Sequence, residues 1–306
     1  MTQVGPTNYD PIPIGEVAKP PFARLPDPLT IFVRRAERLR ALAEGHELGA
    51  YLTFLADLSD VQHGAEREPP GAELPAPDTT ARARQFKMPL LDRLRFTRSA
   101  AFDASWEGLL AAAGRIVMPD DARLALDRLK AADPAARAAI IGAVLNNAIP
   151  AEALAQHVFI AAVLQVHFAH LAAQLDAKAL MPVGNGACPV CGAPPVSSMV
   201  VGWSGAQNTR FCACSLCGTL WNYPRIKCTL CGGTEGIAYQ EVAGGSAATV
   251  KAETCDSCHC YVKILHQHTN PSLDPVADDV ATLALDLLLR ESGYRRGAVN
   301  PFLLGY

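Results

Sequence analysis

Eight of the ten cysteines stand in four Cys-x-x-Cys pairs, which are the most specific chemical feature of this 306-residue sequence. The pairs are Cys188/Cys191, Cys214/Cys217, Cys228/Cys231 and Cys255/Cys258. Two residues between paired cysteines let one tight turn aim both thiolates at one ion, and a tetrahedral metal site takes four such soft donors. Four pairs therefore predict two metal ions, each held by four cysteines.

The spacing of the pairs indicates which of them share an ion. A gap of 22 residues separates Cys191 from Cys214, and 23 residues separate Cys231 from Cys255; ribbon-type metal sites have about this spacing. The first pairs of the two halves repeat at an offset of 40 residues and the second pairs at an offset of 41. A tandem duplication thus favours one site from the first two pairs and one from the last two. A cross-braced arrangement, and pairing across the ten residues between Cys217 and Cys228, stay open as alternatives.

Disulfide and redox chemistry are the other uses of paired cysteines. Disulfides belong in exported proteins, yet Met1 to Lys19 carries Pro, Gly and acidic residues where a signal peptide has a basic start and an apolar run. No run of about 18 uninterrupted apolar residues is present either. We therefore expect a cytoplasmic protein without membrane insertion. A thioredoxin-type enzyme needs one such motif at a strand-to-helix junction, whereas four in strand-and-turn surroundings favour metal.

Two cysteines stand outside the four pairs. Cys212 and Cys260 each lie two residues from a pair, but the duplication aligns them with Glu253 and Thr219. We expect packing thiols, with metal or redox involvement as the alternative. His259 aligns with Gly218 in the same comparison, which argues against a ligand role.

Three histidines, His157, His167 and His170, lie on or near one long predicted helix. A ligand or proton-relay role would need an acidic or cysteine partner at suitable spacing, and none accompanies them. They are predicted to be structural.

The rest of the composition is that of a globular protein, with 50% hydrophobic and 19% charged residues. The net charge is −3, and residues 187–270 hold five basic residues against four acidic ones. Proteins that bind nucleic acid electrostatically usually show a basic patch or stripe. The nearly neutral metal region therefore argues against a nucleic-acid partner.

Residues 25–183 contain no cysteine and are rich in Ala, Leu and Arg at helical spacing. Asp27-Pro28 and Asp133-Pro134 each place a capping carboxylate before a first-turn proline, which predicts two helix starts. Four prolines between Glu66 and Thr80 predict a loop. The longest predicted helix runs from Pro150 to about Leu180, and its apolar middle is typical of the central helix of a bundle.

Beyond this half, β-branched and aromatic segments predict short hairpins around the cysteine pairs. These segments are Val196 to Trp203, Ala248 to Thr254 and Tyr261 to Leu265. A final helix is predicted from Asp274-Pro275 to Gly293, apolar enough to be buried on several sides. The apolar tail from Tyr294 to Tyr306 is expected to dock on the fold.

These segments predict an α+β fold: an N-terminal all-α domain, tandem rubredoxin-like or zinc-ribbon β modules, and a C-terminal helix. The expected boundaries are an extended tail over residues 1–24, a helical domain over 25–183, a ribbon domain over 184–270 (modules 184–224 and 225–270), and a C-terminal helix with docking tail over 271–306. Closed four-thiolate sites leave no position for a substrate or activated water. No phosphate-cradling loop or nucleophile–base arrangement is evident. The sequence therefore predicts a binding protein, not an enzyme.

The order of motifs resembles the formate dehydrogenase accessory protein family, FdhE. The resemblance rests on the four cysteine pairs with the segments 188–199 and 262–265, and on Val-Ala-Asp-Asp at 276–279 and Asn-Pro-Phe-Leu at 300–303. It is specific from about residue 187 onward, and the helical half matches in general character. It implies a cytoplasmic maturation factor that binds the catalytic subunit of a respiratory formate dehydrogenase before export. It also implies rubredoxin-like iron on the eight paired cysteines.

Three functions follow from these observations. The first is an interaction protein whose two metal ions build a docking surface for the dehydrogenase subunit. The second is electron transfer or redox sensing, which requires iron. Thiolates also bind zinc, and the availability of the ion more than its affinity decides which one is found, so zinc is the alternative. The third, a nucleic-acid-binding zinc ribbon, is disfavoured by the charge count.

Overall fold

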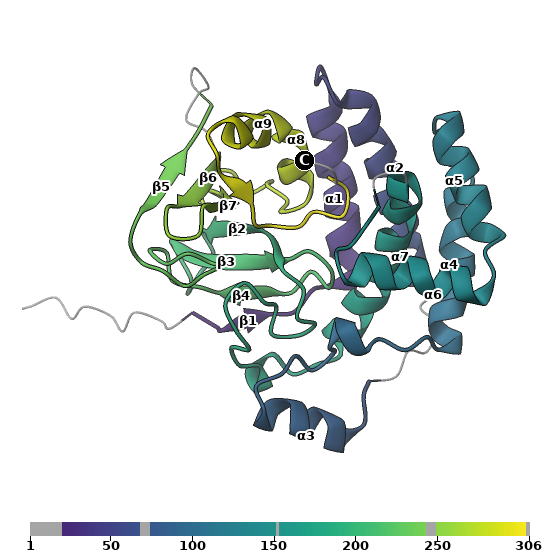
Figure 1. Ribbon diagram of the computed structural model, residues 1–306, viewed down its shortest axis with the longest axis horizontal. Helices are drawn as coiled ribbons and strands as arrows, with labels where there is room; N and C mark the ends of the chain where they lie inside the picture. The colour runs from purple at the N-terminus through teal and green to yellow at the C-terminus, as the bar shows by residue number, and fades with distance from the viewer. Residues whose placement is uncertain (1–19, 68–73, 151–152, 243–248, 304–306) are drawn as a thin grey trace, which may run out of the picture.

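The computed structural model describes residues 20–67, 74–150, 153–242 and 249–303. It shows an N-terminal helical region, then a β-sheet that carries the cysteine pairs, then short C-terminal helices. Figure 1 shows most of the N-terminal helices gathered on one side of the sheet, with the C-terminal helices above the strands. The α+β fold class is confirmed.

Seven α-helices of the described chain precede the cysteine region. They are α1 (Pro28–Ala43), α2 (Gly49–Arg67), α3 (Pro77–Gln85), α4 (Ala100–Ala113), α5 (Asp120–Lys130), α6 (Pro134–Leu145) and α7 (Leu154–Ala173). The Asp27 carboxylate accepts a hydrogen bond from the Leu29 amide (3.1 Å), and Asp133 accepts one from Ala136 (2.8 Å). Both predicted helix starts are therefore confirmed, because each capping carboxylate satisfies an amide left free by the first turn.

Helix α7 is the central helix of the bundle, as its apolar sequence predicts. Fifteen of its residues are buried, from His157 to Ala172 with one interruption. By length and composition alone this helix could cross a membrane, with a mean hydropathy of 1.4 over an 18-residue window. However, 78% of that window is buried inside the fold. Its apolar surface is therefore covered by neighbouring helices and the sheet.

The loop predicted from Glu66 to Thr80 is wrong at both ends. Helix α2 continues to Arg67 and α3 begins at Pro77, because proline is compatible with the first turn of a helix. The middle of that segment, residues 68–73, lies outside the described residues, as do Met1 to Lys19, the start of the predicted strand at Ala248 and the last three residues of the tail.

Eight strands of the described chain form one sheet, in the order β1-β4-β3-β2-β7-β6-β5, with β8 beside β7. Their bounds are β1 (Ala23–Arg24), β2 (Pro195–Val201), β3 (Thr209–Cys214), β4 (Leu220–Asn222), β5 (Ile237–Gln240), β6 (Val250–Cys255), β7 (Cys260–Leu265) and β8 (Arg295–Arg296). Each half contributes an antiparallel meander, and the parallel pairing of β2 with β7 joins them. The two predicted ribbons are thus fused edge to edge.

A buried ion pair reinforces this junction between the two halves. The Arg210 guanidinium on β3 donates to the Glu253 carboxylate on β6 (2.8 Å) and to the Thr229 hydroxyl (2.7 Å), which lies inside the third cysteine pair. The exposed fractions of the Arg210 and Glu253 side chains are 0% and 3%. Burial raises the pKa of Glu253, and the guanidinium opposes that shift. Removing either charge would leave its partner unpaired in the interior.

The single helix predicted between Asp274 and Gly293 is wrong, because Thr282 divides it into α8 (Ala277–Ala281) and α9 (Leu283–Glu291). The Lys263 ammonium donates to the carbonyl oxygens of Asp279 (2.7 Å) and Thr282 (3.1 Å) at this break. The predicted burial on several sides is also wrong for α9, since Leu287 and Leu288 are 46% and 48% exposed and only Leu285, Asp286 and Leu289 are buried. Helix α8 packs against α1 and α2, whereas Leu285 and Leu289 of α9 pack on the sheet.

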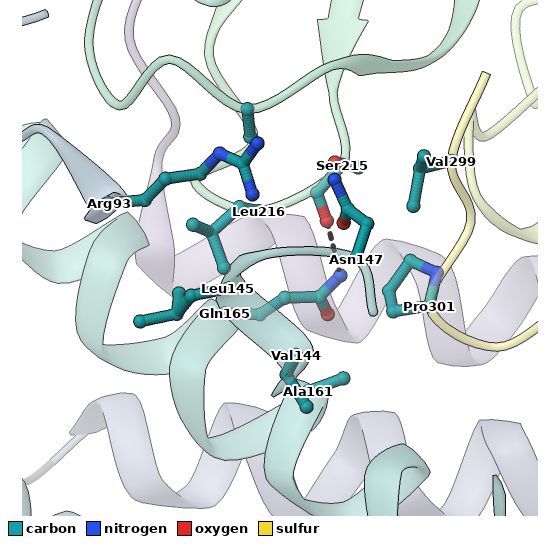
Figure 2. A pocket seen from close by; sticks show the side chains of 11 residues that line it. Arg93, Val144, Leu145, Asn147, Ala161, Gln165, Ser215, Leu216, Val299 and Pro301 are labelled. Atoms are coloured by element: carbon teal, nitrogen blue, oxygen red, sulfur yellow. Dashed lines mark hydrogen bonds between the residues drawn. The ribbon is translucent and has the colours of Figure 1, made fainter. Parts of the chain in front are cut away.

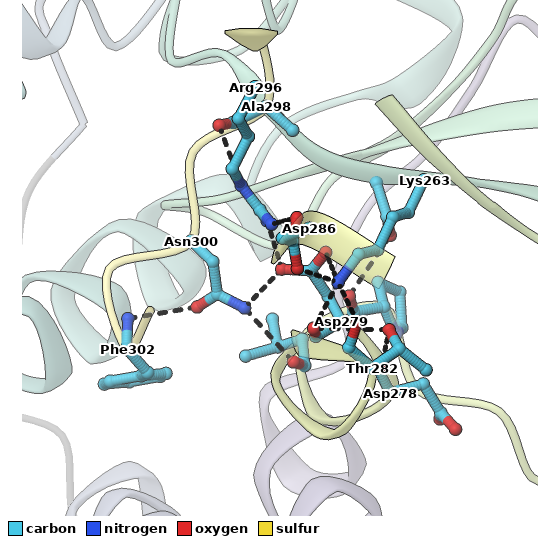
Figure 3. Close-up of polar contacts among 12 residues, drawn as sticks. Lys263, Asp278, Asp279, Thr282, Asp286, Arg296, Ala298, Asn300 and Phe302 are labelled. Carbon is cyan, nitrogen blue, oxygen red and sulfur yellow. Dashed lines mark hydrogen bonds and ion pairs between the residues drawn. The ribbon is translucent and has the colours of Figure 1, made fainter. Parts of the chain in front are cut away.

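A buried network of charges fastens these helices and the tail to β7 (Figure 3). The Lys263 ammonium lies 2.5 Å from the Asp286 carboxylate and 3.4 Å from that of Asp279, and Arg296 pairs with both carboxylates. The Asn300 amide also donates to Asp279 (2.8 Å). Burial opposes ionisation of Asp279, but the two cations outweigh it and lower the pKa of this carboxyl. The tail docks as predicted, with Phe302 and Leu303 buried.

Replacing Lys263 with Met should lower the free energy of unfolding by about 3–5 kcal/mol, because Asp279 and Asp286 would keep only Arg296 as a buried counter-charge. Urea denaturation of the metal-loaded protein measures this loss. Lys251→Met on the adjacent strand is the matched control: its ion pair with Glu241 is partly exposed, so its loss should cost less than about 1 kcal/mol. Equal effects of the two substitutions would contradict the assigned role of the network.

Candidate metal centres

The structure brings the first four paired cysteines together as one group. The sulfur atoms of Cys188, Cys191, Cys214 and Cys217 all lie within 4.8 Å of one another. Cys188 and Cys217 are 3.6 Å apart at sulfur, and Cys191 and Cys214 are 3.4 Å apart. All four side chains are buried, and they belong to the same hydrophobic core as the helices.

The last four paired cysteines form a second group with the same geometry but more exposure. The sulfur atoms of Cys228, Cys231, Cys255 and Cys258 lie within 4.8 Å of one another. The Cys228–Cys258 and Cys231–Cys255 distances at sulfur are 3.8 and 3.7 Å. Cys228 and Cys255 are buried, but Cys258 is half-buried and Cys231 is exposed.

These distances fit a tetrahedral ion and not a disulfide. Four sulfurs at the usual metal–sulfur bond length of about 2.3 Å lie about 3.8 Å apart, whereas a disulfide needs about 2.05 Å. All ten cysteines are free thiols in the structure. The grouping is the one that the tandem duplication favours, and the two alternative pairings are not found.

Three of the four cysteine turns close on a glycine in the left-handed backbone region. Gly192, Gly218 and Gly232 have φ values of +71°, +73° and +78°. His259 occupies the equivalent position of the fourth turn with φ +51°, so it replaces a glycine and not a thiolate. Glycine adopts this conformation without the steric cost that a side chain incurs. The fourth turn therefore keeps the left-handed backbone of the other three, although His259 adopts it less readily than glycine does.

The protonation behaviour of the first group is that of a site built for a cation. Burial raises the pKa values of Cys188 and Cys191 well above the usual range. Burial also opposes ionisation of Cys214, but hydrogen bonds from the other three thiols and the Cys217 amide bring its pKa well below the usual range. Four adjacent thiols cannot all lose their protons in a dry core without a compensating positive charge. A bound divalent or trivalent metal would supply that charge.

The second group is more open to solvent, and its thiols differ in pKa: burial raises the pKa of Cys228 and of Cys258. Burial raises the pKa of Cys255, but hydrogen bonds from the backbone and from Cys231 outweigh it and lower the pKa to about 7. The Gly233 amide donates to the Cys231 sulfur (3.4 Å). Both donor sets fit a soft tetrahedral ion, with four thiolates and no open coordination position.

A chain of buried amides ties the first group to three helices. The Gln165 amide on α7 donates to the Ser215 carbonyl (2.9 Å), which lies inside the second cysteine pair (Figure 2). Its oxygen accepts hydrogen bonds from Arg35 on α1 and Gln62 on α2, both 3.1 Å long. Gln165 and Arg35 are 3% and 4% exposed. The cysteine turn and the bundle are therefore one hydrogen-bonded unit.

The chain after α3 makes a second connection to this group. The Leu91 amide donates to the Val190 carbonyl (2.8 Å), and the Arg93 amide donates to the Cys191 carbonyl (3.1 Å). The Arg93 side chain also reaches the Gly192 carbonyl (3.4 Å). The first cysteine turn thus positions the backbone that connects α3 with α4.

The remaining candidate residues lie outside both groups. Cys212 is buried in the main core, where burial raises its pKa to about 11, and Cys260 donates to the Cys258 carbonyl (3.3 Å). His157 bonds the Ala153 carbonyl, and His167 stacks edge-on against Phe96 and other aromatic rings. Burial lowers the pKa of His167 to about 4, so this imidazole is neutral near pH 7.

Gln165, Arg210 and Arg93 support the metal groups, and none was predicted to do so. A polar residue inside an otherwise apolar helix was the available signal for Gln165, since buried polar groups need partners. Arg210 has no comparable signal, because its partner on β6 is set by the pairing of distant strands.

Each group is predicted to hold one ion. Because the second group is more exposed, we expect it to lose its ion before the first group does. A chelator at neutral pH should withdraw the second ion quickly through Cys231, whereas loss of the first requires opening of the core. Timed metal analysis should therefore show two phases of equal amplitude. A Cys231→Ser/Cys258→Ser variant should lack the fast phase alone. A single phase that removes both ions would contradict this order.

Comparison with known proteins assigns the whole described chain to one family. Family models described as FdhE, N-terminal, FdhE, central domain, and FdhE, C-terminal domain match residues 20–185, 187–225 and 226–303. An FdhE homolog from Rhizobium meliloti is 44% identical, and the alignment covers 99% of this chain and 99% of that relative. An FdhE homolog from Proteus mirabilis is 36% identical, over 92% of this chain and 91% of that relative. The crystal structure of the FdhE protein from Pseudomonas aeruginosa superimposes with a TM-score of 0.84 at 33% identity, over 94% of this chain and 99% of that one. This chain therefore belongs to the FdhE family of formate dehydrogenase accessory proteins.

Proposed function

We propose that this protein acts in the cytoplasm as a maturation factor that binds the catalytic subunit of a formate dehydrogenase and assists its assembly before export. It acts by binding and not by catalysis. Cys188, Cys191, Cys214 and Cys217 hold one metal ion, and Cys228, Cys231, Cys255 and Cys258 hold the other. Iron is favoured by the family resemblance and zinc is the alternative.

The observation that carries this proposal is the position of the first cysteine group, inside the core shared by helices and sheet. An ion bound there by four thiolates has no open coordination position for a substrate, so its role is to stabilise the fold around it. Structural zinc contributes on the order of 10–16 kcal/mol to the folding of small finger peptides. The ion would thereby maintain the surface formed where the bundle meets the sheet. The FdhE names of the relatives support a dehydrogenase as the partner.

Replacing both Cys188 and Cys191 with Ser should weaken capture of the dehydrogenase catalytic subunit at least tenfold, because the first ion and the turn that it holds would be lost. Co-purification of the subunit with the full-length protein measures this, together with metal content and circular dichroism. Cys260→Ser is the matched control: this thiol lies outside both groups and should bind the subunit as the native protein does. Undiminished capture by the double variant without its first ion would refute the proposal.

Electron transfer or redox sensing at the second group is the other candidate function. It is favoured by the exposure of Cys231 and the half-exposure of Cys258, which would let a redox partner approach an iron ion directly. The first group has no such access, since all its sulfurs are buried.

Protein purified from its native host should then show visible absorption that bleaches on reduction and returns in air. Cys231→Ser should change this signal more than Cys191→Ser does, if the exposed ion is the one that turns over. A colourless protein with stoichiometric zinc would exclude the redox function and leave the binding function intact.

A further inference from the structure

An apolar groove of about 760 Å³ lies between α3 and the start of α4. One wall is a single face of α3, where Thr79, Arg82, Ala83 and Phe86 follow at helical spacing. The opposite wall includes Phe96 and, from α7, Phe168. Its volume is that of a site for a large ligand or several side chains of a partner.

Helix α3 is unusual among the α-helices of the described chain because none of its residues is buried. In Figure 1 it lies at the edge of the molecule, away from the other helices. The Phe86 side chain at its end is 60% exposed although it lines the groove. A large aromatic ring that faces an open apolar groove is a feature of docking surfaces.

Arg82 and Arg95 line this groove together with Asp92, and the chain around them is basic. Residues 82–98 contain six Arg or Lys and one acidic residue, within a chain whose net charge is −3. Arg82, Arg84 and Lys87 are exposed and form no ion pair within the described residues. Arg95 is 76% exposed and lies 3.7 Å from Asp92. An apolar floor with a basic rim complements a segment that is apolar on one face and acidic beside it.

The groove is also connected to the first cysteine group. Leu91 lines the groove, and its amide donates to the Val190 carbonyl (2.8 Å) inside the first cysteine turn. The Arg93 amide makes the next such bond to Cys191 (3.1 Å). An ion bound by Cys188 and Cys191 would therefore hold one wall of the groove in place.

We propose that this groove, between α3 and the segment from Leu90 to Ala101, is the docking site for an acidic amphipathic segment of the dehydrogenase catalytic subunit. The inference rests on the proposed function and names the surface that performs it. Apolar side chains of the segment enter the groove beside Phe86 and Phe96, and its carboxylates face Arg82 and Arg95. The second cysteine group makes no part of this site.

Binding of the purified catalytic subunit to the full-length, metal-loaded protein tests this assignment. Phe86→Asp, and separately the Arg82→Glu/Arg95→Glu double variant, should each weaken binding at least tenfold. The double variant should also lose most of the salt dependence of the native complex. Val117→Asp, at an apolar residue that is 88% exposed and outside the groove, is the control for Phe86→Asp. Arg128→Glu/Arg290→Glu is the control for charge reversal, since both arginines are exposed on other helices. All four variants should keep the native metal content and helicity.

The outcomes separate this proposal from the function on which it rests. If the native protein binds the subunit and the groove variants bind equally well, the groove is not the docking site and the proposed function stands. If the native protein does not bind the subunit, both are refuted. A photo-crosslinker at position 86 should join an acidic amphipathic segment of the subunit, whereas one at position 117 should not. Crosslinking from position 86 to a second copy of this chain, or within the chain itself, would overturn the proposal.

Discussion

Four sulfur atoms packed into a core shared by a helical bundle and a β-sheet impose the main physical constraint on this fold. The Cys188 and Cys191 thiols have strongly raised pKa values, whereas Cys214 ionises readily among them. Four thiolates cannot stand side by side in this interior without a cation among them. The sulfur distances of 3.4 and 3.6 Å leave space for a tetrahedral ion. We propose that an ion bound there links the two halves of the molecule.

Hydrogen bonds connect the first cysteine group to the helices and to the groove. Gln165 on α7 bonds to the second cysteine turn, and its side chain also accepts bonds from Arg35 on α1 and Gln62 on α2. The amides of Leu91 and Arg93 bond to the first cysteine turn, and Leu91 lines the groove beside α3. The second group lies beyond the β2–β7 junction and is joined to the first half by Arg210. This arrangement places one cysteine group in the interior and the other where two of its four side chains are at least partly exposed.

Local patterns predicted the features that depend on local geometry. The spacing of the cysteines predicted which sulfurs meet, because two residues between donors define one turn and the duplication relates the turns. Asp27 and Asp133 predicted helix starts for a similar reason, since the cap and the amide that it serves are two or three residues apart. The central position of α7 followed from its apolar middle, which leaves no polar face for solvent.

Features that depend on distant partners were not predicted. The break at Thr282 arises where Lys263, nineteen residues away, takes the carbonyl oxygens at the junction of α8 and α9. The fusion of two ribbons through β2 and β7 pairs Ser198 with Ile264, and no local pattern sets that register. Helix α3 was missed because prolines nearby indicated a loop and its residues bury nothing. We propose that each cysteine group holds one metal ion, and anomalous X-ray scattering from crystals of the natively expressed protein would locate both ions. We expect two anomalous peaks per chain, one equidistant from the sulfurs of Cys188, Cys191, Cys214 and Cys217 and one from those of Cys228, Cys231, Cys255 and Cys258. Disulfides or metal-free thiols at the first group would contradict it.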